Sequence, residues 1–127
     1  MGQYLIDNNA ISNYFSVLFT EKGMSFMAEV LDQTPTISVI TEIEALSWIN
    51  PDKSKEQIVK TFVQDANILA LTPEVVAQTI RIRRSRKIKT PDAIMAASAI
   101  VHNLTLITSD SDFINIENLN IIDPNSL

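Results

Sequence analysis

The chain has 127 residues, of which 46% are hydrophobic and 20% are charged, with 10 basic and 15 acidic residues and a formal net charge of −5. This length and composition are enough for one hydrophobic core and argue against disorder, so we expect a single domain over residues 1–127. Because the chain has no cysteine and only one histidine, His102, disulfides, thiolate zinc sites and multi-histidine metal sites are excluded. Any metal chemistry must therefore depend on oxygen ligands.

No apolar run approaches the roughly 20 residues needed to cross a bilayer, and the N-terminus lacks the basic-then-apolar pattern of a signal peptide. We therefore expect a cytoplasmic protein without a membrane partner.

Strand and helix patterns alternate along the chain. Apolar or β-branched runs predict five strands, at 3–6, 36–40, 67–71, 104–110 and 119–122. Helical spacing or start signals predict six further elements, all helices. The first covers 10–18, in a region that ends at Gly23, and the second covers 24–31. The others begin at Thr41, cover 55–63, run from Pro73 through Lys89, and cover 93–101. This alternation predicts a parallel sheet with helices on both faces.

Acidic side chains follow several of the predicted strands. Asp7 follows the first strand, Glu42 and Glu44 begin the helix after the second, and Asp110 ends the fourth. Asp92 lies at a helix N-terminus, which faces the same edge of such a sheet as the strand ends. Because converging acids repel one another, they need a cation, and an oxygen-only site suits Mg²⁺ or Mn²⁺.

Each acid also fits a purely structural role. Asp7 can cap the next helix, Asp92 can complement a helix dipole, and Glu42 and Glu44 can face solvent. Asp110 and Asp112 can build a turn, because "SDSD" has ordinary turn chemistry. The functional interpretation depends on finding several such acids at one edge of the fold.

The segments "YLIDNNAISNYF", "ISVITEIEAL" and "TPDAIMAASAIVHNLTLITSDSDF" resemble, in order and spacing, the motifs of PIN domains, specifically of VapC toxins from type II toxin–antitoxin pairs. The resemblance runs from Tyr4 to about Asp123. It implies a single PIN domain with a three-layer α/β/α fold and a central parallel sheet of about five strands. The catalytic and metal-binding acids that it implies are Asp7, Glu44, Asp92 and Asp110, with Asp112 as a further metal ligand.

The choice between Glu42 and Glu44 depends on the family pattern, in which the glutamate lies three residues after the threonine, here Thr41. That pattern favours Glu44. The family has threonine or serine where this chain has Asn8, and we expect Asn8 and Thr108 to support the metal ligands by hydrogen bonds.

The resemblance implies a metal-dependent endoribonuclease that uses carboxylate-bound Mg²⁺ or Mn²⁺ and activated water to hydrolyse RNA phosphodiester bonds. It also implies tRNA or rRNA as substrate, a cognate antitoxin as partner, and a homodimer. The alternative is a PIN scaffold that binds RNA or a protein partner without cleaving. A haloacid-dehalogenase-like phosphatase is disfavoured because Asn9 stands where that family needs a second aspartate.

A basic run precedes Asp92 and is predicted to bind the RNA backbone, although a solvated helix face explains such a run equally well. Its members are Arg81, Arg83, Arg84, Arg86, Lys87 and Lys89. The net charge of −5 does not exclude RNA, because five acids at the predicted site account for all of it. We expect Trp48, Phe15 and Phe62 to serve packing, and His102 to lie at the surface or at a helix end.

Overall fold

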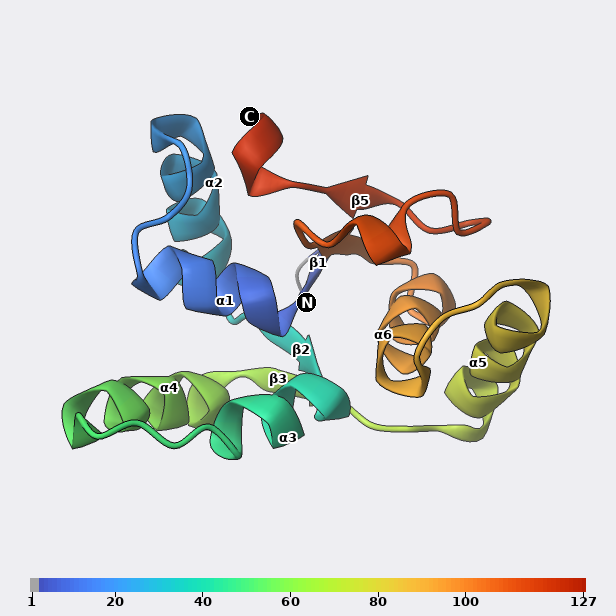
Figure 1. Cartoon of the computed structure of the whole chain (residues 1–127), viewed down its shortest axis with the longest axis horizontal. Helices are drawn as coiled ribbons and strands as arrows, with labels where there is room; N and C mark the ends of the chain where they lie inside the picture. The colour runs from blue at the N-terminus through green and yellow to red at the C-terminus, as the bar shows by residue number, and fades with distance from the viewer. Residues whose placement is uncertain (1–2) are drawn as a thin grey trace.

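The computed structural model describes residues 3–127, and Figure 1 shows short central strands with helices on either side. The elements in chain order are β1 (Tyr4–Ile6), α1 (Asn8–Phe15), α2 (Glu21–Asp32), β2 (Thr36–Ser38), α3 (Val39–Leu46), α4 (Lys53–Asp65), β3 (Asn67–Leu69), α5 (Pro73–Ser85), α6 (Thr90–Val101), β4 (Thr105–Ile107), η1 (Ser111–Phe113), β5 (Ile121–Ile122) and η2 (Pro124–Ser126). The elements η1 and η2 are 3₁₀ turns.

All strand pairings in residues 3–127 are parallel, as the sequence predicts. One ladder has the order β1-β4-β5, and a second joins β2 to β3. β2 lies beside β1 without extending the first ladder. The predicted sheet of about five strands is therefore hydrogen-bonded as three strands plus two, because each strand is only two or three residues long and the ladder stops between β1 and β2.

Successive residues of β1 and β4 point to opposite faces of the sheet, and each face has its own core. Leu5 and Leu106 pack with the buried residues of α5 and α6. Ile6 and Ile107 pack instead with buried residues of α1, α2 and α4. Figure 1 shows these two groups of helices on opposite sides of the strands. The predicted three-layer α/β/α fold is confirmed.

α6 is the most buried helix of the described residues, and every side chain from Ala93 to Ala99 is buried. The small residues Ala96, Ala97 and Ala99 are each 0% exposed, so α6 packs closely through them, as predicted. The one polar residue in this stretch, Ser98, donates its hydroxyl to the Ile94 carbonyl at 2.8 Å. No helix in residues 3–127 has the length and apolarity that a membrane crossing requires.

The prediction that Gly23 ends a helical region is wrong, since Gly23 lies inside α2. The helix begins at Glu21 because the Thr20 side chain caps it, accepting a hydrogen bond from the Gly23 N–H at 3.0 Å. A Cβ at position 23 would collide with the Pro124 carbonyl oxygen. Glycine is therefore needed here for the close approach of η2.

Other predicted helix boundaries also need correction, and α1 ends at Phe15 rather than near Leu18. α3 begins at Val39 rather than Thr41, because Ser38, the last residue of β2, caps the helix by accepting from the Ile40 N–H. α5 ends at Ser85 instead of running through Lys89. The segment 86–89 is a loop between α5 and α6, which places the second half of the basic run off the helix.

Candidate metal centre

Asp7 stands at the carboxyl end of β1. Its backbone N–H donates to the Ile107 carbonyl at 3.0 Å, which continues the pairing of β1 with β4 by one residue. The side chain is only 8% exposed and forms no capping hydrogen bond with α1. A capping role therefore does not explain why a carboxylate occupies this buried position.

Thr108 links two of the predicted acids. Its hydroxyl donates to Oδ2 of Asp7 at 2.7 Å. The hydroxyl oxygen of Thr108 also accepts from the backbone N–H of Asp110 at 3.1 Å. Thr108 is 1% exposed, so these bonds form away from solvent. The hydroxyl fixes the carboxylate of Asp7 relative to the backbone of Asp110.

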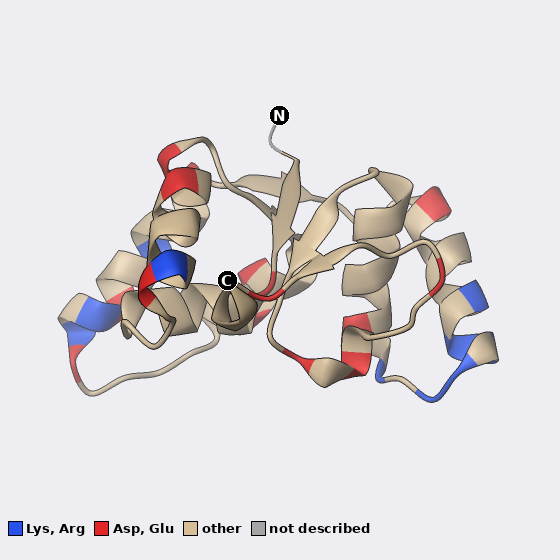
Figure 2. Cartoon of the chain, turned by 90° about the horizontal axis from the view of Figure 1, so that it is seen from above, with Lys and Arg blue, Asp and Glu red and all other residues tan. Residues whose placement is uncertain are grey.

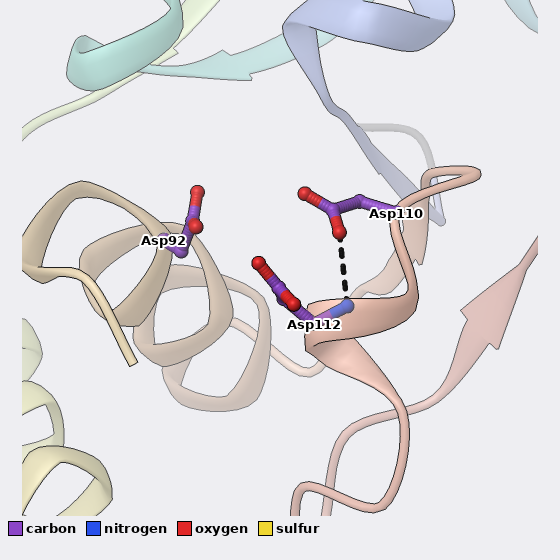
Figure 3. A group of neighbouring side chains, drawn as sticks. All are labelled: Asp92, Asp110 and Asp112. Atoms are coloured by element: carbon purple, nitrogen blue, oxygen red, sulfur yellow. Dashed lines mark hydrogen bonds between the residues drawn. The ribbon is translucent and has the colours of Figure 1, made fainter. Parts of the chain in front are cut away.

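Three carboxylates come together beside this pair. Asp110 follows β4 and caps η1, accepting from the Asp112 N–H at 2.9 Å, while Asp92 lies in the first turn of α6. One oxygen from each of Asp92, Asp110 and Asp112 lies within 4.8 Å of the other two. Figure 3 shows the three side chains directed into the same space between α6 and η1. Phe113, 1% exposed, anchors η1 in the core.

Glu44 on α3 is electrostatically coupled to the same group. Burial raises the pKa of Glu44, and the charge of Asp92 raises it further. The charge of Glu44 in turn raises the pKa of Asp7. Asp7 and Glu44 thus act on the cluster by charge, although in residues 3–127 the oxygens of Asp92, Asp110 and Asp112 alone meet within 4.8 Å.

Burial and mutual repulsion make the site unfavourable for negative charge. Burial raises the pKa of Asp7 to about 6, against opposing effects of the Thr108 hydroxyl and the Asn8 backbone N–H. Burial also raises the pKa of Asp92, and the charges of Asp110 and Asp112 add to this rise, while Lys89 lowers it. A divalent cation bound to carboxylate oxygens would relieve both effects, so these residues fit Mg²⁺ or Mn²⁺.

The six predicted RNA-binding residues differ in what their side chains do. Arg81 donates to Gln78 at 3.1 Å, and Arg83 donates to the Ile88 carbonyl at 3.2 Å. Arg86 donates to two carbonyls of the segment after β4. In the part of the chain that the structure describes, Arg84, Lys87 and Lys89 make no side-chain hydrogen bond or ion pair.

The basic segment lies at the same end of the molecule as the acids. Figure 2 shows blue segments at the end of α5 and along the loop into α6, next to red segments at the start of α6. Lys89 is close enough to Asp92 to lower the pKa of Asp92. Cations therefore border the acidic site on the α5 side.

The remaining residues singled out in the sequence have mixed positions. Trp48 is 43% exposed and Phe15 is 41% exposed, so packing in the core does not account fully for either side chain. Phe62 is half-buried and contacts Phe15 edge to face. His102 ends α6, as predicted. The contact of Arg86 with the segment after β4 was not predicted, because the sequence pattern placed Arg86 inside a helix that runs through Lys89.

The three-layer fold with parallel strands, and the carboxylates at one edge of it, place this chain among small α/β proteins with an acidic site. A PIN domain family model matches residues 4–119, and the chain therefore belongs to the PIN domain family. A comparison with curated proteins gives no match.

Several solved structures share this fold. A chain of a toxin–antitoxin complex from Klebsiella pneumoniae is 27% identical, with a TM-score of 0.74, and the match covers 95% of this chain and 97% of that one. FitAcB from Neisseria gonorrhoeae gives 22% identity and a TM-score of 0.80, covering 98% and 99%. VapBC2 from Rickettsia felis, bound to a fragment of promoter DNA, gives 19% and 0.76, covering 94% and 96%.

Proposed function

We propose that this protein is a VapC-type toxin, an endoribonuclease that depends on Mg²⁺ or Mn²⁺ and hydrolyses RNA phosphodiester bonds. The observation that carries the proposal is the meeting of Asp92, Asp110 and Asp112 oxygens within 4.8 Å. Membership of the PIN domain family and the likeness to a chain of a toxin–antitoxin complex support it.

In this proposal, Asp92, Asp110 and Asp112 hold the metal, and Asp7 and Glu44 complete the catalytic acids. Glu44 is preferred to Glu42 because the charge of Glu44 raises the pKa of Asp7 and the charge of Asp92 raises the pKa of Glu44. When bound, the metal supplies a lowered pKa for coordinated water and polarisation of the phosphate oxygens. The chain's own contribution is to orient the five carboxylates and to exclude solvent around Asp7.

The RNA backbone is proposed to pass along the basic segment before α6. Lys89 borders Asp92, and the side chains of Arg84 and Lys87 are exposed. Arg81 is also exposed on α5, beside its bond to Gln78. Phosphate contacts from this segment would hold the strand against the metal centre and would weaken as salt is added. A tRNA or rRNA target places the proposed activity in the cytoplasm.

The proposed partners are a cognate antitoxin and a second copy of the chain. An apolar groove of about 470 Å³ lies between α1, α2 and α4 and includes Phe15, Ile58 and Phe62. This groove offers the antitoxin an apolar docking surface. Exposed apolar residues on α3 and α5, among them Ile43 and Ile80, are available for a homodimer contact.

The proposal is tested by incubating the purified chain with total cellular RNA and Mg²⁺ or Mn²⁺ and mapping new 5′ ends. We expect discrete ends that disappear with EDTA and with Asp92→Asn but remain with Asp32→Asn, a control that removes one exposed carboxylate at the far end of α2. Tight RNA binding without metal-dependent ends would contradict nuclease activity and support the non-cleaving PIN scaffold. The preparation must be free of a bound antitoxin.

A further inference from the structure

Arg86 connects the end of α5 to the segment that carries two of the clustered acids. It is the C-cap residue of α5, with an extended backbone. Its Nη1 donates to the Ile114 carbonyl at 3.1 Å, and its Nη2 donates to the Asp112 carbonyl at 3.4 Å. The two ends of one planar guanidinium thus hold carbonyls two residues apart, a geometry that a lysine ammonium cannot match.

These carbonyls lie at the end of η1, where a short helix leaves its last C=O groups without partners. A cationic side chain at this position satisfies them and complements the local dipole. The start of η1 is fixed by the Asp110 cap, and its middle is fixed by the buried ring of Phe113. At the end of the same turn, Arg86 adds two side-chain bonds to the backbone bond from the Ile114 N–H to the Ser111 carbonyl at 3.1 Å.

The guanidinium uses one N–H of each terminal nitrogen for these two carbonyls. Its Nε is buried without a hydrogen-bond partner in the described residues, so the side chain bears a desolvation cost to hold this position. Both of its terminal nitrogens are engaged. This distinguishes Arg86 from Arg84, which is exposed and makes no such contact.

We propose that Arg86 is a positioning residue for the metal centre, holding η1 so that the carboxylates of Asp110 and Asp112 face Asp92. This inference rests on the proposed function, because it assigns Arg86 to the assembly of that site. It replaces the RNA contact expected for Arg86 from the sequence. Loss of the two bonds would free the end of η1 and spread the three ligands apart.

The test is Mn²⁺ binding, measured from the electron paramagnetic resonance signal of free Mn²⁺ for the purified chain and its variants. Arg86→Gln is compared with Arg83→Gln and Arg84→Gln, which remove the same charge from the same segment without touching η1. Losing a residue that supports metal ligands costs about 10- to 100-fold in metal affinity, and we expect a loss in that range for Arg86→Gln alone. Arg86→Lys, which keeps the charge but lacks the planar fork of the guanidinium, should fall between.

Two further readouts separate positioning from general damage and from RNA contact. Millimolar guanidinium should restore Mn²⁺ affinity to Arg86→Ala, which no global unfolding would allow. In EDTA, Arg86→Gln should bind a single-stranded RNA oligonucleotide as tightly as the wild-type chain does.

The outcomes decide between the two proposals. Equal Mn²⁺ affinity in wild type and Arg86→Gln would overturn the positioning role, as would equal losses in all three charge-removing variants. Absence of Mn²⁺ binding by the wild-type chain would instead overturn the proposed metal centre, and the role of Arg86 with it.

Discussion

The hydroxyl of Thr108 donates to Oδ2 of Asp7 at 2.7 Å, joining the ends of β4 and β1 across 101 positions of sequence. Both side chains are buried, and the same hydroxyl oxygen accepts from the Asp110 N–H. The Thr108 hydroxyl therefore links the carboxylate of Asp7 to the backbone of Asp110 by hydrogen bonds.

Thr108→Val should destabilise the protein while preserving its shape. The substitution removes the donor to a buried carboxylate and the acceptor for the Asp110 N–H, and we expect a loss of about 1–3 kcal/mol in the free energy of unfolding. Thr108→Ser keeps the hydroxyl and should lose less. Urea unfolding of both variants in the absence of metal checks this, and equal stability of Thr108→Val and wild type would refute it.

Asp7 should make metal-free stability depend on pH. Its pKa is about 6 in the folded chain against 3.8 for an unperturbed aspartate, so the folded state binds the proton more tightly. The contribution of Asp7 to the free energy of unfolding is therefore greatest below pH 3.8, the pKa of the unperturbed group. It is lost as pH rises through about 6, by at most about 3 kcal/mol. In EDTA, Asp7→Asn should be more stable than wild type at pH 7.5.

The wild type and Asp7→Asn should have similar stability at pH 4, where Asp7 of the folded wild type is protonated. Urea unfolding from pH 4 to 8 measures the difference directly. Replacing Asp7 also removes its charge from the neighbourhood of Glu44 and Asp92, so the comparison measures Asp7 together with its coupling to these two acids. A difference that does not change with pH would mean that burial does not raise the pKa of Asp7.

The sequence pattern brings Asp92 and Asp110 to one edge of the fold, because strand ends and helix starts of a parallel fold share that edge. The catalytic role of these acids stays a prediction. Asp7 and Asp110 follow apolar strands, and Asp92 follows a helix start signal, features that local pattern alone can locate. Contacts between these segments were not predictable, because they depend on how far each element extends. Arg86 illustrates this, because it contacts η1 from the extended backbone that follows the last turn of α5.

Gly23 shows the same limitation for the fold. Its position in the sequence indicated a helix end, yet α2 continues through it, and glycine is needed there because the Pro124 carbonyl of η2 leaves no room for a Cβ. Gly23→Ala in an unconstrained helix would be stabilising by about 1 kcal/mol, whereas here the Cβ would collide with the Pro124 carbonyl oxygen. We expect a lower melting temperature for Gly23→Ala, and an increase would show that η2 is readily displaced.

Divalent metal should stabilise the folded chain through the acidic cluster. A ligand at 100 times its dissociation constant adds about 2.7 kcal/mol to the free energy of unfolding. We expect Mn²⁺ to raise the melting temperature of wild type and of Asp32→Asn, EDTA to reverse the rise, and Asp92→Asn to show little of it. A rise in Asp92→Asn as large as in wild type would place the ion elsewhere.

The basic loop before α6 should contribute to RNA binding through charge. Lys87 and Lys89 are exposed, and within residues 3–127 their side chains have no hydrogen-bond or ion-pair partner. Each phosphate contact to a single strand adds about 0.7 to the slope of log affinity against log salt, so the double substitution Lys87→Gln with Lys89→Gln should reduce the slope by about 1.4. Lys22→Gln on α2 removes one exposed charge far from the acids and should leave the slope unchanged. Binding of a labelled RNA oligonucleotide in EDTA between low and physiological salt gives both slopes. If all three proteins share one slope, the loop is only a solvated surface and the RNA takes another path to the acidic site.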